Sequence, residues 1–248
     1  MSSRQAVLLV GGRGIRLGYL TARTPKPLLS VAGRPFLSHL VERLAAQGFR
    51  DILLLTGYLA EAFQAFQADW SARGVTITCR VETEAAGTGG ALHLALPELA
   101  PDFLVLNGDS LFAIDLAEFL ASPLPPGVDG RLALRRVPTT DRYGTVTLAD
   151  GRITGFQPHG AAPGPGVINA GVYWLRREAV TEAPALPCSL EADIFPGLAQ
   201  AGRLEGRILD GYFLDIGVPD DFARAQVDFA PGGAAALYNG TGQAEAGA

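Results

Sequence analysis

The feature that most constrains the fold is a short apolar run near the N-terminus that breaks into a glycine loop. Residues 6–10 read AVLLV, and this β-branched and leucine-rich composition predicts a buried strand. Residues 11–14 read GGRG, so the backbone turns sharply and many of its amides are unshielded by side chains. Amides that converge in such a loop form a concave binding site for an anion such as a phosphate.

Lys26 points to the same kind of ligand. It is the only lysine in a chain with 20 Lys and Arg residues, and it stands between Pro25 and Pro27. Because the chain uses arginine everywhere else, this lysine predicts a site that requires a compact ammonium group. With Arg16 close to the glycine loop, Lys26 favours a nucleoside triphosphate site; the alternative is one lysine on a solvated loop.

Two common phosphate-binding motifs are excluded. A P-loop places Lys-Ser or Lys-Thr directly after its last glycine, and the sequence contains neither pair. A dinucleotide-binding fingerprint requires a third glycine where this chain has Leu17. The loop is therefore expected to bind phosphate in another way.

The pattern after the loop alternates between helix and strand. We expect helices over residues 36–48 and 60–72, and strands over residues 51–56 and 75–81. This β-α-β-α-β order indicates an α/β fold with an open, mostly parallel sheet and helices on both faces. Such sheets bind ligands at the carboxyl ends of their strands, which is where the glycine loop lies.

Two aspartates suit a metal ion that accompanies a triphosphate. Asp109 follows a predicted strand over residues 102–108, and Asp215 lies inside an apolar strand. Mg²⁺ is commonly held by one or two carboxylates together with phosphate oxygens. The alternatives are an Asx turn or a cap at Asp109 and a buried ion pair at Asp215.

A glycine-rich turn over residues 87–90 leads into a helix that is expected to end near residue 99. Its glycines either let a flat ligand approach the backbone or permit a tight turn with a close contact between helix and sheet. Glu82 precedes the turn, and its carboxylate only accepts hydrogen bonds, which suits the N–H donors of guanine. Uracil and thymine also offer one such donor.

The second half of the chain suits a sugar. After a proline-rich stretch that begins near residue 122, strands are expected over residues 131–137, 144–148 and 152–157. Asn169 lies beside a small-residue gap and can donate to and accept from sugar hydroxyls, or else it caps a bulge. Glu191 follows Ser189, an N-cap residue, so it either contacts the sugar or is a first-turn glutamate favoured by the helix dipole.

The run GGRGIRL at residues 11–17, followed by TPKP at residues 24–27, resembles the signature of the sugar-1-phosphate nucleotidyltransferases, the sugar-nucleotide pyrophosphorylases. The resemblance extends from about Gln5 to Ala230. It implies the nucleotide-diphospho-sugar transferase fold, a Rossmann-like open mixed sheet, mostly parallel and flanked by helices.

The resemblance also implies a domain organisation. Residues 1–230 form one nucleotidyltransferase domain, with a nucleotide-binding half (1–121) and a sugar-binding half (122–230). The Gly- and Ala-rich residues 231–248 are expected to form a disordered tail without a readable role.

By the same resemblance, the chain transfers a nucleotidyl group from an NTP to a sugar 1-phosphate with Mg²⁺ as cofactor and releases pyrophosphate. The implied catalytic residues are Arg16, Lys26 and Asp109, and the implied metal ligands are Asp109 and Asp215. The implied nucleotide-binding residues are Val10, Gly11, Gly12, Arg13, Gly14, Glu82, Gly87, Thr88, Asn107 and Gly108. The implied sugar-binding residues are Asn169, Gly171 and Glu191.

Within the family, the chain is most similar to the D-glycero-α-D-manno-heptose 1-phosphate guanylyltransferases, which use GTP and serve surface polysaccharide synthesis. The alternatives are a glucose- or mannose-type enzyme using UTP, dTTP or GTP and, from other classes, a non-catalytic sugar-nucleotide sensor or a glycosyltransferase. The chain departs from the family pattern at Ile15, Tyr19 and Val218. It also lacks a second lysine near His159, so that histidine, an arginine or another arrangement would hold the sugar phosphate.

Composition limits the partners. The net charge of −5 argues against a nucleic-acid surface. Cys79 and Cys188 lack metal-ligand spacing and are expected to be reduced. The sequence has no run of 18 apolar residues and no signal peptide pattern, so a cytoplasmic protein without membrane contact is expected. Its partners would be the small-molecule substrates, and it would be a monomer or a homodimer.

Overall fold

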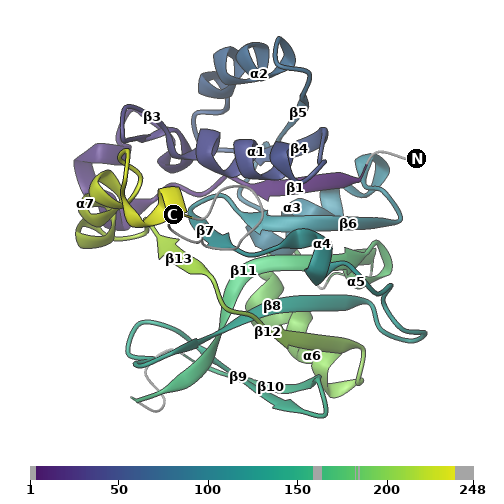
Figure 1. The fold of residues 1–248 in the computed structure, drawn as a ribbon. Helices are drawn as coiled ribbons and strands as arrows, with labels where there is room; N and C mark the ends of the chain where they lie inside the picture. The colour runs from purple at the N-terminus through teal and green to yellow at the C-terminus, as the bar shows by residue number, and fades with distance from the viewer. Residues whose placement is uncertain (1–3, 159–163, 182, 184, 238–248) are drawn as a thin grey trace. The chain divides into compact units, whose positions relative to one another are not determined.

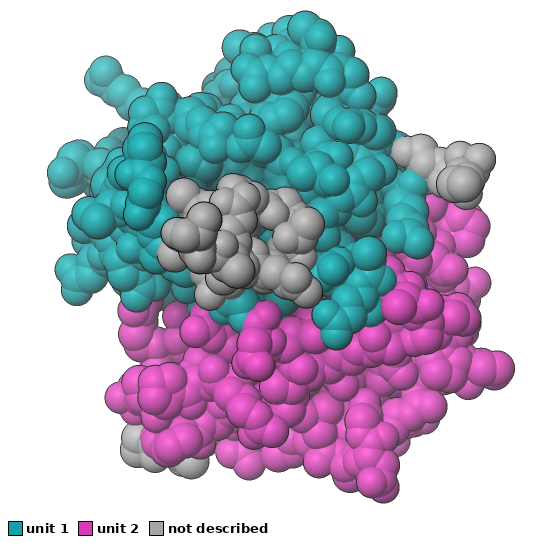
Figure 2. Space-filling view, viewed as in Figure 1, with its two compact units in different colours: residues 1–85, 106–118, 211–248 teal, residues 86–105, 119–210 magenta. Residues whose placement is uncertain are grey.

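The computed structural model describes residues 4–158, 164–181, 183 and 185–237. Two compact units make up the chain, and each consists of segments that are separate in the sequence (Figure 2). Unit 1 comprises residues 1–85, 106–118 and 211–248, and unit 2 comprises residues 86–105 and 119–210. The predicted nucleotide-binding half (1–121) and sugar-binding half (122–230) are each continuous in the sequence, so their bounds differ from those of the two units. The assignment of one half to the nucleotide and the other to the sugar remains a prediction.

A parallel sheet forms the first part of unit 1. Strands β1 (Gln5–Leu9), β4 (Asp51–Thr56) and β5 (Thr76–Val81) lie in the order β5-β4-β1 (Figure 1). Helix α1 (Phe36–Ala46) lies between β1 and β4 in the sequence, and α2 (Phe63–Ser71) lies between β4 and β5. Apart from one terminal residue each, β1 and β4 are buried, as is usual for parallel strands. The predicted β-α-β-α-β order is confirmed.

Strands β7 (Ser110–Ala113) and β13 (Tyr212–Asp215) of unit 1 form an antiparallel ribbon that places Asp215 opposite Ser110. The strand that carries Asp215 was predicted, but β7 was not, because a strand of four residues is too short to show a clear period in the sequence. The other short elements are η1 (Ile15–Thr21), η2 (Lys26–Leu28), β2 (Ser30–Val31), β3 (Arg34–Pro35) and η3 (Ala60–Ala62). Helix α7 (Pro219–Asp228) follows the ribbon.

Unit 2 contains a mainly antiparallel sheet. Its strands are β8 (Gly130–Val137), β9 (Thr145–Ala149), β10 (Arg152–Gln157), β11 (Gly166–Arg176) and β12 (Leu204–Ile208), in the order β11-β8-β12-β10-β9. β8 and β12 run parallel, β9 and β10 form a hairpin where strands were expected over residues 144–148 and 152–157, and β9 also pairs with β11. The chain thus combines parallel and antiparallel pairing, which is the mixed sheet that was predicted.

Helices cover part of this sheet. They are α3 (Gly87–Leu94), α5 (Glu178–Thr181), the π-helix η5 (Leu190–Ile194) and α6 (Phe195–Gln200). Phe195 of α6 packs edge-on against Tyr173 at 5.1 Å and is stacked with Phe156 at 6.2 Å between ring centroids. Helix α3 ends earlier than predicted, because Pro97 follows in the 3₁₀ turn η4 (Leu96–Glu98). Strand β6 (Asp102–Asn107) carries the chain from unit 2 into unit 1.

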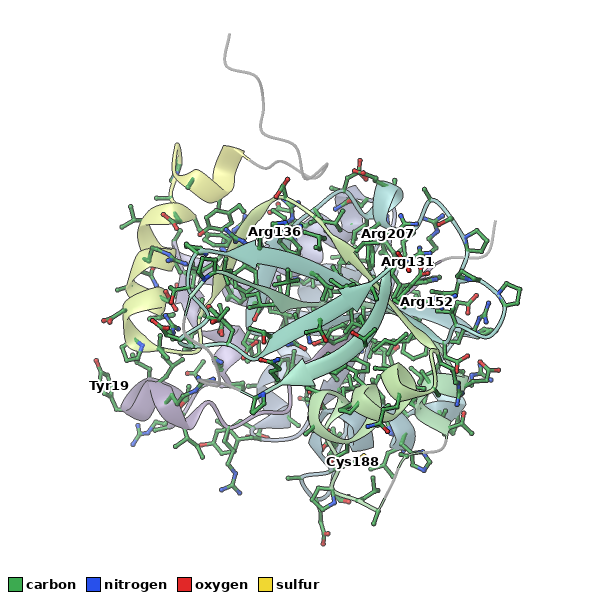
Figure 3. All side chains as sticks on the ribbon, turned by 90° about the horizontal axis from the view of Figure 1, so that it is seen from below. Tyr19, Arg131, Arg136, Arg152, Cys188 and Arg207 are labelled. Atoms are coloured by element: carbon green, nitrogen blue, oxygen red, sulfur yellow. The ribbon has the colours of Figure 1, made fainter. Side chains whose placement is uncertain are left out.

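A buried arginine ties together the layers of unit 2. Arg131 on β8 is 1% exposed and forms an ion pair with Glu205 on β12. Its guanidinium also donates to the carbonyls of Phe119 (2.9 Å) and Ser122 (2.8 Å). Arg207, on the same strand as Glu205, donates to the Ser122 hydroxyl at 2.5 Å, and Figure 3 labels both arginines. These bonds compensate for the loss of hydration of the buried charge.

Three further expectations concern the cysteines, the C-terminal tail and membrane-spanning helices. Cys79 and Cys188 are free thiols, as predicted, and Cys188 is buried (Figure 3). Of the predicted tail, residues 231–237 include the 3₁₀ helix η6 (Ala234–Leu237), and the rest lies outside the described residues. Within the described ranges, no helix has the length and apolar character needed to span a membrane.

Candidate active site

The glycine loop directly follows β1 and precedes η1. A Cβ atom on Gly12 would meet no atom of the described residues within 4 Å, so this part of the chain leaves open space beside the residue. Gly14 has a left-handed backbone (φ +62°), and a Cβ atom there would lie 2.9 Å from Thr21 Cγ2 and 3.1 Å from Lys26 Cβ. Glycine is therefore required at position 14 by its backbone conformation and by the close packing of Lys26.

Lys26 is buried rather than solvated. It lies on η2 and is 7% exposed, which excludes the alternative of a lysine on a solvated loop. Its Nζ lies 2.5 Å from Oδ2 of Asp109. This ion pair offsets the cost of taking the ammonium group out of water.

The two predicted metal ligands lie on neighbouring segments of unit 1. Asp109 stands between β6 and β7, and its Oδ1 accepts a hydrogen bond from Ser110 Oγ at 3.0 Å. Asp215 ends β13, and the amide of the next residue, Ile216, donates to the Asp109 carbonyl at 2.9 Å. The ribbon therefore holds the two aspartates close together.

The electrostatic environment of Asp215 reflects this proximity. Burial raises the pKa of its carboxyl group above the ordinary value, and the negative charge of Asp109 raises it further. Lys26, the Gly217 amide and Arg16 act in the opposite direction. The Gly217 amide donates to Asp215 Oδ1 at 2.6 Å.

Gly217 marks the point where three charged side chains meet. A Cβ atom at this position would lie 2.7 Å from Asp215 Oδ1, 3.2 Å from Arg16 Nη2 and 3.3 Å from Lys26 Nζ. Any side chain here would displace these groups, so glycine is required for their close approach. Sequence reasoning missed Gly217, although its place two residues after Asp215 could have indicated it.

These residues fit a magnesium ion that arrives with a phosphate ligand. Among the described residues, no group of three or more His, Cys, Asp and Glu side chains could hold a metal ion. Two carboxylates are sufficient for Mg²⁺ when substrate phosphates and water supply its other ligands. Asn107, just before Asp109, has a buried side-chain oxygen without a hydrogen-bond partner in the part of the chain that the structure describes. An unpaired acceptor of this kind suits a bound ligand or its water.

The remaining nucleotide-side residues of unit 1 surround the glycine loop. A Cβ atom on Gly11 would lie 3.5 Å from Glu82 Oε1, so the Glu82 carboxylate lies beside the loop. Gly108 donates its amide hydrogen to the Leu9 carbonyl at 3.0 Å, and a Cβ atom there would collide with Val10. The separately predicted residues Val10, Gly11, Glu82 and Gly108 are thus brought together.

The glycine-rich turn at the start of α3 belongs to unit 2. It packs against residues 188–194 of the same unit. A Cβ atom on Gly87 (φ +77°) would collide with the Cys188 carbonyl, and one on Gly89 would lie 2.7 Å from Ile194 Cδ1. The amides of Gly89 and Gly90 both donate to the Cys188 carbonyl, at 3.0 and 3.1 Å. These glycines therefore serve a close contact with residues 188–194, which favours the tight-turn alternative over the approach of a flat ligand.

The sugar-side residues form one hydrogen-bonded network in unit 2. Glu191 accepts from the hydroxyls of Thr88 (3.0 Å), Ser189 (2.9 Å) and Tyr173 (3.1 Å). Asn169 Nδ2 donates to the Tyr173 hydroxyl at 2.9 Å. The Ser189 hydroxyl accepts from the Glu191 and Ala192 amides, which confirms its N-cap role, although the helix it caps is a π-helix.

Tyr173 was not among the predicted site residues, and the assignment of Thr88 to the nucleotide remains a prediction. Tyr173 is fully buried inside the apolar strand β11, so its sequence context indicated a core residue. Gly171 is linked to the network because its amide donates to Asn169 Oδ1 at 3.0 Å. His159 lies outside the described residues.

Comparison with known proteins identifies the family. A sequence profile described as nucleotidyl transferase matches residues 5–231. The chain belongs to the nucleotidyl transferase family. This nucleotidyltransferase is 34% identical over 225 residues to a D-glycero-alpha-D-manno-heptose 1-phosphate guanylyltransferase from Aneurinibacillus thermoaerophilus, covering 90% of this chain and 96% of the relative.

One further sequence relative and one crystal structure are also similar to this nucleotidyltransferase. It is 37% identical over 232 residues to the mannose-1-phosphate guanylyltransferase of Mycobacterium tuberculosis, and the match covers 92% of this chain. The match spans only 65% of that longer relative. The crystal structure of HddC from Yersinia pseudotuberculosis, complexed with GMP-PN, superimposes with a TM-score of 0.79 at 31% identity and covers 90% of this chain and 98% of HddC. The predicted fold is confirmed by this similarity.

Proposed function

We propose that this nucleotidyltransferase transfers a guanylyl group from GTP to a sugar 1-phosphate, with a heptose 1-phosphate as the favoured acceptor, and releases pyrophosphate. Support for the base comes from the guanylyltransferase relatives and from HddC, whose crystal structure holds GMP-PN. Support for the sugar comes from the D-glycero-alpha-D-manno-heptose 1-phosphate guanylyltransferase of Aneurinibacillus thermoaerophilus, to which this chain is 34% identical over 225 residues.

The observation that carries the proposal is the meeting of two cations and two carboxylates beside the glycine loop. Lys26 and Arg16 would neutralise charge on the transferring phosphoryl group and on the leaving pyrophosphate. The loop amides at Gly11, Gly12 and Gly14 would bind phosphate oxygens. Glu82, beside the loop, would accept hydrogen bonds from the N–H groups of guanine.

Asp109 and Asp215 would hold Mg²⁺ together with phosphate oxygens of the nucleotide. When bound, the ion would supply positive charge against the α-phosphate. The attacking oxygen of the sugar phosphate is already an anion at neutral pH, so no general base is required. The side chains therefore act by positioning the reactants and stabilising charge.

The sugar would be held by Asn169, Gly171 and Glu191 of unit 2. An amide and a carboxylate provide both a donor and an acceptor for sugar hydroxyls. The net charge of −5 supports small-molecule substrates in preference to nucleic acid.

The test is pyrophosphate release with Mg²⁺ across the four common NTPs and the 1-phosphates of heptose, mannose and glucose. We expect the highest kcat/KM with GTP and heptose 1-phosphate. Lys26→Ala and Asp109→Asn should each lower kcat/KM by about 100-fold or more. Arg73→Ala, which removes an exposed pair with Asp69 and a contact with the Trp70 ring, is the matched control.

Each other outcome assigns a different function. A preference for mannose 1-phosphate, which the 37% identity to the mannose-type relative would explain, keeps the chemistry and replaces the sugar. Release with UTP or dTTP instead of GTP contradicts the proposed base. No release with any pair, together with tight binding of a sugar nucleotide, indicates a non-catalytic sensor.

A further inference from the structure

Three hydroxyl groups of unit 2 converge on the carboxylate of Glu191. Those of Thr88 and Ser189 lie 3.0 and 2.9 Å from Oε2, and that of Tyr173 lies 3.1 Å from Oε1. They come from three elements that are far apart in the sequence: α3, the segment before η5, and β11. Such convergence on one carboxylate exceeds what a first-turn glutamate requires.

The direction of each of these hydrogen bonds follows from the partners. The Leu190 amide donates to Thr88 Oγ1 at 2.8 Å, the Glu191 amide donates to Ser189 Oγ at 3.1 Å, and Asn169 Nδ2 donates to the Tyr173 hydroxyl at 2.9 Å. Each hydroxyl accepts from one of these N–H groups, and because a carboxylate can only accept, its single hydrogen is directed to Glu191. The carboxylate is therefore held by three donors at once.

This arrangement leaves a defined capacity for a ligand. A carboxylate has about four acceptor positions, and the described residues occupy two on Oε2 and one on Oε1, which leaves one on Oε1 among the residues that the structure describes. The Gly171 amide fixes the orientation of the Asn169 amide group by donating to its Oδ1 at 3.0 Å. Within the same described ranges, Asn169 keeps one N–H for donation. The network can accept one hydrogen bond at Glu191 and donate one at Asn169, which matches sugar hydroxyls.

We infer that Thr88 is a positioning residue for the sugar, and not a nucleotide contact: its hydroxyl, together with those of Tyr173 and Ser189, fixes the Glu191 carboxylate so that Oε1 accepts from a sugar hydroxyl. This inference rests on the proposed function. Thr88 gives its only hydrogen to Glu191, so it has none to donate to a base. The glycines beside it contact residues 188–194 and thereby bring the Thr88 hydroxyl to Glu191.

The test measures whether a substitution changes KM for the sugar 1-phosphate without changing KM for the NTP. Thr88→Val keeps the shape of the side chain but removes its hydroxyl, and it should raise KM for the sugar 1-phosphate about 10-fold while KM for the NTP stays within 2-fold. Tyr173→Phe, which removes the donor to Oε1, should produce the same separation. Thr88→Ser, which retains the hydroxyl, should restore most of the affinity for the sugar phosphate.

Controls distinguish positioning from loss of structure. Thr154→Val removes a hydroxyl that donates to an exposed threonine, Thr147, and should change neither constant. Thermal unfolding of every variant shows whether the protein remains folded. If Thr88→Val does not fold, Tyr173→Phe and Thr88→Ser still test the inference.

An increase in KM for the NTP without one for the sugar phosphate, or no change in either constant, would overturn the inference. A wild-type protein that turns over no substrate pair would contradict the proposed function alone. In that case, calorimetric binding of a sugar 1-phosphate to wild type and to Thr88→Val is the readout. A 10-fold loss of affinity would support the role of Thr88, and equal affinity would contradict it.

Discussion

At the scale of single residues, the phosphate side of the site depends on close approach. Lys26, Asp215 and Arg16 each have an atom within 3.3 Å of the place where a Cβ atom would stand on Gly217. Such packing positions charged groups before the substrate binds, which is the condition under which electrostatic stabilisation is most effective.

Gly217→Ala should therefore reduce activity without unfolding the protein. The added methyl group would lie 2.7 Å from Asp215 Oδ1 and would force this carboxylate to move. Because small displacements of catalytic groups can cost about 100-fold, we expect a decrease of that size in kcat/KM for pyrophosphate release. The matched control is Gly197→Ala, where a Cβ atom meets no other atom within 4 Å. Activity within 2-fold of wild type in Gly217→Ala would contradict this role.

The sequence predicted the charged residues of unit 1 better than the network of unit 2. Lys26 and Asp215 were singled out because charges between prolines or inside apolar strands have few structural explanations, and Asp109 because it follows a strand at the same sheet edge; the structure brings these three side chains together, while their roles remain predictions. The hydroxyl partners of Glu191 could not be predicted. Thr88 lies 103 residues away from Glu191, and Tyr173 lies within an apolar strand that gives no sign of a polar role.

At the scale of elements, regular patterns were predicted and irregular ones were not. The parallel strands of unit 1 are continuous apolar runs, which a sequence shows clearly. Strand β12 was missed because Glu205 and Arg207 interrupt its apolar character, and their partners lie on other segments. The π-helix η5 was expected to be an α-helix because both begin with the same N-cap signal.

The ion pair between β8 and β12 should contribute strongly to stability. Glu205→Ala would leave the Arg131 guanidinium buried without its counter-charge, although its bonds to carbonyl oxygens would remain. Loss of one partner from a buried pair costs about 3–5 kcal/mol, and we expect the lower end of that range in chemical denaturation. Arg73→Ala breaks an exposed pair with Asp69 and a contact with the Trp70 ring, and it should cost about 1 kcal/mol or less. Equal effects of the two substitutions would contradict the structural role of Arg131.

Helix α1 should make stability depend on pH. His39 is 6% exposed and packs edge-on against Phe229, and its Nδ1 lies 3.1 Å from Arg34, which can only donate. The neutral ring therefore carries its hydrogen on Nε2 and donates it to the Val31 carbonyl. Burial lowers the pKa of His39 below 6.5, and this effect exceeds the opposing effect of the Val31 carbonyl.

The sign of this dependence follows from proton binding. Below pH 6.5 the unfolded chain binds a proton at His39 that the folded chain does not, so the free energy of unfolding falls as pH decreases toward the folded pKa. A single group can contribute at most about 1.4 kcal/mol per pH unit. His39→Gln cannot titrate and should show a smaller decrease between pH 7 and pH 5.5 in denaturation experiments. Identical pH profiles for the two proteins would refute this contribution.

At the scale of the whole molecule, each group of site residues belongs to one compact unit. Lys26, Asp109 and Asp215 come from three separate segments of the sequence, and all belong to unit 1. Thr88, Tyr173 and Glu191 are also widely spaced, and all belong to unit 2. The discontinuous units thus assemble each group from distant segments. We therefore expect substitutions in unit 1 to act on the nucleotide and those in unit 2 to act on the sugar.

Removal of divalent metal should abolish activity without lowering the stability of the free protein. A metal ion that stabilises a fold usually has most of its ligands from protein, and the described residues offer no cluster of three. The melting temperature in EDTA should therefore equal that in Mg²⁺, while pyrophosphate release should cease in EDTA and return when Mg²⁺ is added. A lower melting temperature in EDTA alone would indicate a structural metal instead.

The nucleotide should then make stability depend on the metal. GTP at 100 times its Kd stabilises the folded state by about 2.7 kcal/mol, which corresponds to a rise in melting temperature of several degrees for a chain of this size. Because the two carboxylates need phosphate oxygens to complete the coordination of Mg²⁺, the rise should be larger with Mg²⁺ than with EDTA. Asp215→Asn should remove most of this difference, and Thr88→Val should preserve it. If GTP raises the melting temperature of the wild type equally with and without Mg²⁺, the metal does not contribute to nucleotide binding. That result would contradict the assignment of Asp109 and Asp215 as its ligands.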